Sequence, residues 1–167
     1  TVIPCTHYTH DSLYVLPVKP SPNLPNMRAV YLYPSLALFE GTVINLGRKT
    51  DFPFQVFGHP EMEYTGFNYT LNSKKTDRYN GIDLRSIPLD SILKKGFSLS
   101  YLIYAFNHTP QKENFFNPFF YNLSGSGILQ QQIREGIPEE EIRKSWHPGL
   151  SEFSKTRSKY LLYPDFR

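Results

Sequence analysis

The stretch PSPNLPNMRAVYLYPSLALFEGTVINLGRKTDFPFQVFGHP, residues 20–60, decides how this chain folds. Three prolines fall within its first six positions, and a lone glutamate, Glu40, follows an apolar run. An arginine and threonines lie beside its glycines. A segment that only packs would be apolar and periodic. This stretch instead predicts a shaped surface built from turns, with polar groups held at fixed points.

The composition is typical of one packed domain. The chain has 167 residues, of which 40% are hydrophobic and 16% aromatic. A chain of this length buries roughly 70% of its unfolded surface. The 12 tyrosines and 13 phenylalanines are numerous enough to line a sugar or ligand groove, although packing in a core is their more frequent role.

Charge and cysteine content exclude several classes of protein. The net charge of +3 is spread along the chain without a run of lysine or arginine, so nucleic-acid binding is not indicated. Cys5 is the single cysteine, which excludes an intrachain disulfide and a cysteine-based zinc site. No apolar run approaches the length of a membrane span.

Prolines divide the chain near residue 26. Four of them fall between residues 17 and 25, where they forbid helix and central strand. Residues 1–26 therefore predict an extended, proline-rich arm, and residues 27–167 a single α/β domain. The chain begins at Thr1, without Met, in a strand-like segment. We therefore expect a piece of a longer protein, with the arm coming from a junction between domains.

The first half of the domain begins with a helix. Asn26 is expected to cap it, and it would run from Met27 to about Tyr33. Pro34 would then interrupt or kink it, because a proline disfavours helix in the residue before it.

Alternating apolar residues next predict strands at 52–57 and 67–71, and a third strand at 81–87. The residues expected on one face of the first strand are Phe52, Phe54 and Val56. The polar segment 72–80 predicts a turn or a long hairpin loop.

From Leu89 onward the chain predicts helices. Ser98 is a suitable cap for a helix at 99–107. A compact aromatic loop is expected around Pro118. A second helix at 126–135 would be closed by a glycine in the left-handed conformation.

Two further helices are expected at the end of the chain. Pro138 suits the first turn of one that ends near Trp146, and Pro148 would open another to about Tyr163. The predicted fold class is therefore α/β (α+β), with a small mixed β-sheet followed by a helical C-terminal part.

Glu40 is the leading candidate for chemistry. An acidic side chain after an apolar run, with glycine next, can be held in a partly desolvated cleft. Such a cleft raises the pKa of the carboxyl group and suits acid–base work on a glycosidic bond. The alternative is a glutamate that bonds nearby backbone amides.

Two pairs of polar residues could bind a ligand. Arg48 and Thr50 can present a planar guanidinium and a hydroxyl to a carboxylate or to sugar hydroxyls, or they form a solvated surface turn. Ser21 and Asn23 sit on a stiff backbone, which reduces the entropy lost on binding. Their alternative role is a turn that caps the next helix.

Metal and cofactor sites are not indicated. His7, His10 and Asp11 resemble half of a metal site, but no cysteine or second histidine pair completes it. Gly125 and Gly127 lack the third glycine and the acidic partner of a dinucleotide fingerprint. We therefore expect no metal and no cofactor.

Four separated segments, in order, resemble the C-terminal half of the NamZ/YbbC-type family. They are PSPNLP, YLYPSLALFEGT, GRKTDFPFQVFGHP and KSWHPGLSEFSKTRSKYLLYPDF. The family, long called a domain of unknown function, is now grouped with exo-β-N-acetylmuramidases. The resemblance covers essentially the whole chain, and several motifs in order are far more specific than any one of them.

The resemblance implies a two-part parent protein with a larger Rossmann-like N-terminal domain, absent here, and a smaller α/β C-terminal domain. The active site is then expected in the cleft between them. The implied reaction releases N-acetylmuramic acid from the non-reducing end of peptidoglycan fragments. A periplasmic or extracellular location is implied for the parent.

Individual motifs carry the resemblance to named positions. The family's Pro-Ser-Pro-Asn falls on residues 20–23, its Phe-Glu-Gly-Thr on 39–42 and its Gly-Arg-Gly-Thr on 47–50. In the last motif Lys49 replaces a glycine, which would have allowed a positive φ or a close ligand approach. The family's Gly-Ala-Pro-Trp is changed at 58–61, where a tryptophan that could stack on a sugar is missing.

The expected site combines one catalytic carboxylate, Glu40, with a set of substrate-binding residues. These are Ser21, Asn23, Tyr33, Thr42, Arg48, Thr50 and Gln55. Glycoside hydrolysis usually needs two carboxyl groups roughly 5–10 Å apart, and no second obvious one lies beside Glu40. We therefore expect this chain alone to have little or no hydrolase activity, and the sequence leaves open whether it is itself an enzyme. The alternative is a non-catalytic module that binds muropeptides or a protein.

Overall fold

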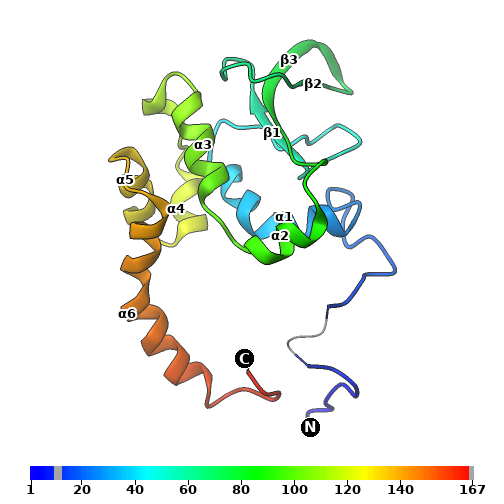
Figure 1. Ribbon diagram of the computed structural model, residues 1–167, viewed down its shortest axis with the longest axis vertical. Coiled ribbons are helices and arrows are strands. Elements are labelled where there is room, and N and C mark those ends of the chain that lie inside the picture. Colours follow the sequence, from blue (N-terminus) through cyan, green and yellow to red (C-terminus); the bar gives the residue numbers. More distant parts are fainter. Residues whose placement is uncertain (10–12, 166–167) are drawn as a thin grey trace.

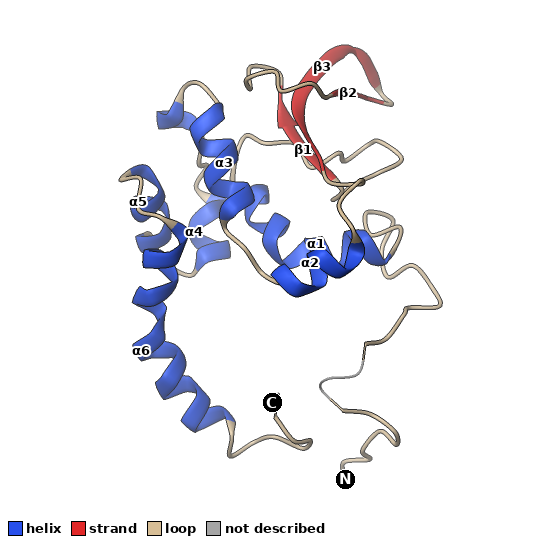
Figure 2. Ribbon diagram, in the orientation of Figure 1, coloured by secondary structure: helices blue, strands red, loops and turns tan. Residues whose placement is uncertain are grey.

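A computed structural model describes residues 1–9 and 13–165, except for the side chains of 74 and 75 (Figure 1). A small sheet lies at one end, helices form the rest of the regular structure, and loops and an extended N-terminal arm complete the chain (Figure 2). The predicted α/β fold class is confirmed. The strands are β1 (Val56–His59), β2 (Asn68–Leu71) and β3 (Lys74–Asp83). The helices are α1 (Met27–Leu36), the 3₁₀ turn η1 (Ala37–Gly41), α2 (Leu89–Lys95), α3 (Ser100–His108), the 3₁₀ turn η2 (Lys112–Asn114), α4 (Phe119–Ser124), α5 (Ile128–Arg134) and α6 (Glu139–Arg157).

The sheet has the order β1-β3-β2, and both pairings are antiparallel, so the expectation of a mixed sheet was wrong. The prediction of a loop at 72–80 was wrong, because most of that segment is the central strand. Only Asn72 and Ser73 form the turn between β2 and β3. The polar side chains misled because Thr76, Asp77 and Arg78 face solvent, while strand pairing depends on backbone groups that every residue carries.

The strand predicted at 52–57 is shorter than expected and begins at Val56. Phe54 has a positive φ of 56°, which breaks the alternation before the strand starts. Its side chain packs in the main core, whereas Val56 packs in a second, small cluster with Tyr69 and Leu71. Phe54 and Val56 therefore do not share one face.

Helix α1 begins as predicted and ends later. The Asn26 side chain accepts a hydrogen bond from the Ala29 N–H at 3.0 Å. Pro34 does not end the helix, which continues to Leu36. Burial on both sides of the proline explains this, because Leu32 and Leu36 are both within the core and offset the lost backbone hydrogen bond.

The helical predictions further along hold except near prolines. At the start of α3, the Ser98 hydroxyl accepts a hydrogen bond from the Ser100 N–H at 3.1 Å. After α5, Gly136 has the expected left-handed conformation, with a φ of 74°. The residues after Pro118 form α4 rather than a loop. The two helices expected at the end of the chain are one, α6, which runs through Pro148.

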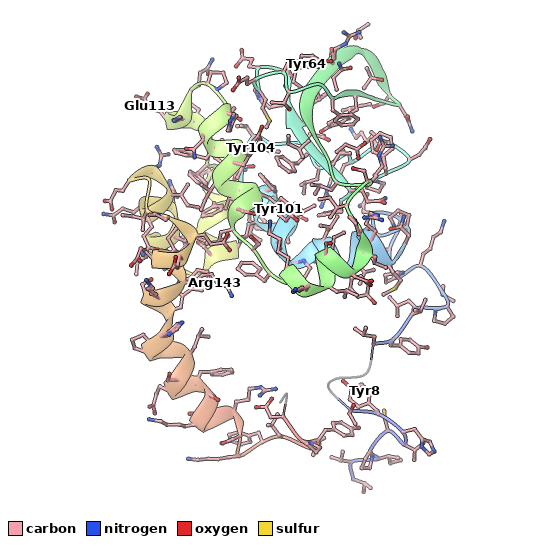
Figure 3. The ribbon with its side chains drawn as sticks, viewed as in Figure 1. Tyr8, Tyr64, Tyr101, Tyr104, Glu113 and Arg143 are labelled. Carbon is pink, nitrogen blue, oxygen red and sulfur yellow. The ribbon has the colours of Figure 1, made fainter. Side chains whose placement is uncertain are left out.

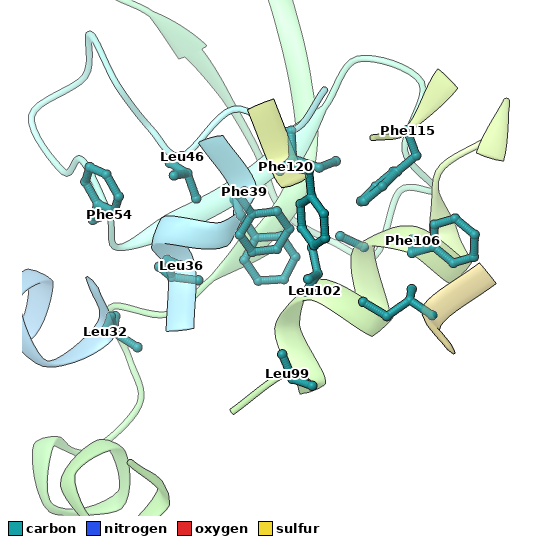
Figure 4. Packing of buried hydrophobic residues seen from close by; sticks show 14 of the residues in the cluster. Leu32, Leu36, Phe39, Leu46, Phe54, Leu99, Leu102, Phe106, Phe115 and Phe120 are labelled. Atoms are coloured by element: carbon teal, nitrogen blue, oxygen red, sulfur yellow. The ribbon is translucent and has the colours of Figure 1, made fainter. Parts of the chain in front are cut away.

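The main core joins α1, η1, α3 and α4 to the segment before the sheet. Figure 4 shows buried side chains from these elements converging. The Phe39 and Phe57 rings stack with centroids 5.2 Å apart, and Phe120 is fully buried beside η1. Each buried phenylalanine stabilises the fold by roughly 1.5–3 kcal/mol. The core thereby fixes η1, which carries Glu40.

Candidate functional site

An open hollow of about 240 Å³ lies between η1 and the loop that leads toward the sheet. Its lining residues are Phe39, Glu40, Thr42, Ile44, Asn45, Leu46 and Arg48. Apolar side chains form its floor, since Phe39, Ile44 and Leu46 are buried. A ligand lying on this apolar floor could therefore bond to the polar groups of Glu40, Asn45 and Arg48.

Glu40 and Arg48 form an ion pair at this hollow. Nη2 of Arg48 donates to Oε1 of Glu40 at 2.7 Å. The two side chains remain 44% and 29% exposed, for Arg48 and Glu40 respectively. Among the residues that the structure describes, no protein group bonds Oε2 of Glu40 or Nε and Nη1 of Arg48. The pair therefore keeps an acceptor and several donors available to a ligand.

The backbone around Glu40 is held by α4 and by Asn117, which precedes this helix. Asn117 donates its N–H to the Gly41 carbonyl at 2.9 Å, and its amide group lies 3.4 Å from the Glu40 carbonyl. A Cβ on Gly41 would come within 2.4 Å of the Phe120 Cα. Glycine at this position therefore allows η1 and α4 to approach, with Phe39 buried on one side and Glu40 open on the other.

Arg48 sits in a tight turn. Thr50 donates its N–H and its hydroxyl to the Gly47 carbonyl at 3.1 and 2.6 Å. Gly47 and Lys49 both have left-handed φ values, 66° and 67°. The expectation that lysine would limit a positive φ was wrong, although the left-handed conformation costs a non-glycine residue roughly 1–2 kcal/mol. The guanidinium of Arg48 also lies 5.3 Å from the ring centre of Phe54.

Asn45 lines the hollow and was not predicted from the sequence. Its Oδ1 accepts from the Gly47 N–H at 2.8 Å and from the Tyr69 hydroxyl at 3.2 Å. The Tyr69 hydroxyl also donates to the Asn45 carbonyl at 2.8 Å, and burial raises the pKa of that phenol. These bonds use Oδ1 of Asn45, and no described residue accepts a hydrogen bond from its side-chain N–H groups. An asparagine two residues before a glycine is a turn signal, and it could have been noticed.

The threonines of the two motifs serve mainly the backbone. Thr42 lines the hollow but is 9% exposed. Its hydroxyl donates to the Phe39 carbonyl at 2.8 Å and accepts from the Ile44 N–H at 3.1 Å. Thr50 likewise accepts from the Phe52 N–H at 3.1 Å. Both hydroxyl groups bond to the backbone and so hold the shape of the loop around the hollow.

Tyr33 and Gln55 have different surroundings. Tyr33 is 39% exposed, and its ring centre lies 5.1 Å from that of Phe54, the ring below Arg48. Gln55 is 5% exposed, and its side-chain oxygen accepts from the Asn26 amide at 3.1 Å. Tyr33 therefore borders the Arg48 side of the site, whereas Gln55 connects the cap of α1 to the core.

Ser21 and Asn23 form a local turn in the arm. The Ser21 hydroxyl accepts from the Asn23 N–H at 3.2 Å, and its carbonyl accepts from the Leu24 N–H at 3.0 Å. Within the described ranges, no hydrogen bond joins either residue to Glu40 or Arg48. The structure thus brings together Glu40, Thr42 and Arg48 at one hollow, and the catalytic or binding role of every residue in the expected set stays a prediction.

The half-site pattern of His7, His10 and Asp11 is described only in part. His10 and Asp11 lie outside the described residues. In residues 1–9 and 13–165, no group of three His, Cys, Asp or Glu side chains could hold a metal ion. The helices of this same part of the chain include none that is long and apolar enough to cross a membrane.

The architecture is that of the DUF1343 proteins. The structure of one from Bacteroides fragilis NCTC 9343 matches 99% of this chain and 49% of that one, with a TM-score of 0.93 and 44% identity. A second DUF1343 protein of the same strain has a TM-score of 0.62 at 15% identity, covering 88% of this chain and 45% of that one. The second likeness shows the shared fold alone.

Residues 31–163 match the family described as exo-beta-N-acetylmuramidase NamZ, C-terminal. The chain belongs to this family. The peptidoglycan beta-N-acetylmuramidase NamZ of Bacillus subtilis (strain 168) is 31% identical in an alignment 166 residues long, which covers 87% of this chain and 40% of that protein. The chain thus spans half or less of the length of these relatives.

Proposed function

We propose that this chain is the C-terminal domain of a peptidoglycan glycosidase of the exo-β-N-acetylmuramidase type. In this proposal its hollow binds the N-acetylmuramic acid end of a cell-wall fragment and forms one wall of the active-site cleft. The family match and the B. subtilis relative support the class of reaction. A substrate of this kind suggests a periplasmic or extracellular parent.

The open ion pair at the hollow carries the proposal. N-acetylmuramic acid differs from N-acetylglucosamine by a lactyl group that ends in a carboxylate. The donors of Arg48 left over by Glu40 suit that carboxylate, because guanidinium groups bind carboxylates in a planar, often bidentate geometry. Oε2 of Glu40 can at the same time accept a hydrogen bond from a sugar hydroxyl.

Catalysis requires a second carboxyl group. Two such groups usually flank the scissile bond roughly 5–10 Å apart, and Glu40 is the only carboxylate among the residues that line the hollow. We assign Glu40 the role of one of them and place the other on the remaining part of the parent. The isolated chain is accordingly expected not to release N-acetylmuramic acid from a model substrate.

The same observation supports an alternative. A hollow with one carboxylate can also belong to a module that holds muropeptides without turnover. Mixing this chain with the remaining part of its parent separates the two functions. Activity that appears on mixing and is lost with Glu40→Gln supports the glycosidase, whereas binding without turnover supports the module.

Sugar binding by the chain itself tests the shared basis of both functions. A disaccharide with a non-reducing N-acetylmuramic acid is titrated while backbone NMR signals are followed. Arg48→Ala should weaken binding about tenfold or more, because a hydrogen bond to a charged group contributes roughly 1.5–3 kcal/mol. Arg85→Ala, which removes another exposed arginine, is the matched control. Equal losses in both variants, or none in Arg48→Ala, would contradict the site.

A further inference from the structure

Helix α6 carries one apolar stripe along its whole length. Ile142, Trp146, Leu150 and Phe153 follow the spacing of a single helix face. Ile142 is fully buried, but Leu150 and Phe153 are 57% and 61% exposed. The first half of the stripe is therefore covered by the domain, and the second half is bare.

The contacts that hold α6 to the domain stop where the stripe becomes bare. Glu139 accepts from the Leu99 N–H at 2.9 Å, and Arg143 donates to the Phe97 carbonyl at 3.0 Å. The Trp146 ring lies 6.2 Å from that of Phe97. No hydrogen bond joins residues 147–156 of α6 to the described part of the sheet or of α1–α5. Figures 1 and 2 show this second half extending away from the rest of the domain.

The arm and the segment after α6 lie at this same end of the molecule. The Cys5 N–H donates to the Tyr163 hydroxyl at 2.7 Å, and the Tyr8 ring lies 5.0 Å from the Tyr163 ring, edge to face. Figure 3 shows Tyr8 here, far from the sheet. Other large apolar side chains of the two segments are exposed, namely Val2, Ile3, Leu13, Tyr14, Val15, Val18, Tyr160 and Leu162.

We propose that the bare half of α6, with the adjoining tail and arm, is the docking surface for a second folded domain. The partner is the part of the parent that corresponds to the unmatched portion of the relatives. In the B. fragilis protein, a domain nearly superimposable on this one accounts for only 49% of the chain, so a body of similar size accompanies it. The partner would present an apolar face, because a large exposed apolar surface marks an interaction site.

The hollow and this surface lie on different elements. The hollow is formed by η1 and the loop after it, whereas the docking surface belongs to α6 and the two ends. Docking at α6 would therefore use none of the residues that line the hollow. The partner is taken from the proposed function, but the two proposals can fail separately.

A linked protein tests the docking surface. The chain is joined to the unmatched part of the B. fragilis relative, in that relative's order, and thermal unfolding is followed by calorimetry. Docked domains should unfold together. Leu150→Asp combined with Phe153→Asp should separate the transitions or lower the melting temperature by roughly 5–10 °C, because two apolar side chains lose their cover.

Two controls make the result specific. Ser151→Asp with Lys155→Gln makes the same change in net charge on the side of α6 opposite the stripe and should leave unfolding unchanged. In the chain alone, Leu150→Asp with Phe153→Asp should shift the melting temperature little, since both side chains are already exposed.

Three outcomes would overturn the docking surface. They are equal melting of the linked protein with and without the stripe substitutions, an equal loss in the chain alone, and a dimer of the chain in sedimentation that the same substitutions dissociate. The last would assign the face to a second copy. Sugar binding by the chain is measured separately, so a failure at Arg48 leaves this result intact.

Discussion

Two ion pairs on this domain have similar exposure and different surroundings. Arg85 and Asp83 have side chains 40% and 27% exposed, close to the values for Arg48 and Glu40. Arg85, however, grips both oxygens of Asp83, with Nε at 2.9 Å from Oδ1 and Nη2 at 2.8 Å from Oδ2. Its guanidinium also lies 4.2 Å from the ring centre of Phe52.

The two pairs differ in how many of their hydrogen-bonding groups remain without a protein partner. Asp83 additionally accepts the Arg85 backbone N–H at 2.9 Å, so this pair is closed on itself. Arg48 touches only one oxygen of Glu40, at the mouth of a hollow. Exposed ion pairs contribute little stability, and their presence alone therefore indicates no function. Incomplete pairing beside a cavity is the feature that makes Glu40 and Arg48 the candidate ligand site.

The largest expected effect comes from breaking the support of the open pair. Gly41→Ala would place a Cβ within 2.4 Å of the Phe120 Cα, a backbone contact that no rotamer change relieves. We expect a loss of about 3 kcal/mol in the free energy of unfolding, measured by urea denaturation. Gly149→Ala is the control, because a Cβ there meets no atom within 4 Å. Gly149→Ala should be neutral or stabilise α6 by about 0.5–1 kcal/mol. A Gly41→Ala protein as stable as the parent would show that η1 and α4 can separate freely.

A smaller effect is expected at the turn that carries Arg48. Lys49→Gly should raise the free energy of unfolding by about 0.5–1 kcal/mol, because glycine adopts the φ of 67° without steric cost. The gain is the strain relieved minus the extra entropy lost by glycine. Lys49→Ala, which shortens the side chain but keeps a Cβ, is the control and should give no such gain. A destabilised Lys49→Gly would mean that the lysine side chain holds the turn.

The smallest effect is expected at the closed pair and depends on pH. The hydrogen bond from Arg85 lowers the pKa of Asp83, while burial opposes the shift. Because the pKa is lower in the folded state, the stabilisation is complete above the ordinary value near 3.9 and is lost as the pH falls through the folded pKa. Arg85→Ala should therefore cost less than about 1 kcal/mol at neutral pH. The difference from the parent should shrink below about pH 4. NMR titration of Asp83 checks this, and an unchanged pKa in Arg85→Ala would refute the pairing.

The sequence was most informative where structure is local. Asn26 caps α1 and Gly136 follows α5 because each depends on its own few neighbours. The prolines misled because tertiary burial decides whether a helix continues past them, as it does at Pro34. The polar β3 was missed because backbone pairing with β2 and β1, rather than the character of its own side chains, makes it a strand.

The candidate site was predictable in part for the same reason. Glu40 and Arg48 stand out as polar residues in an apolar, glycine-containing stretch, and the structure places them in contact. The sequence marks Asn45 only as a turn residue two positions before a glycine, whereas its contact with Tyr69 of β2 depends on the tertiary fold. Gln55 was expected to bind substrate, but it is buried beside Asn26. Its burial depends on the tertiary fold, which its neighbours in the sequence do not indicate.

The most direct test of the open pair follows two arginines in one sample. The Nε–H NMR signals of Arg48 and Arg85 are recorded while the N-acetylmuramic acid disaccharide is added to the chain. The signal of Arg48 should shift in proportion to the bound fraction, and that of Arg85 should stay in place. A static Arg48 signal at saturating sugar, or equal movement of both, would contradict a ligand site at the Glu40–Arg48 hollow.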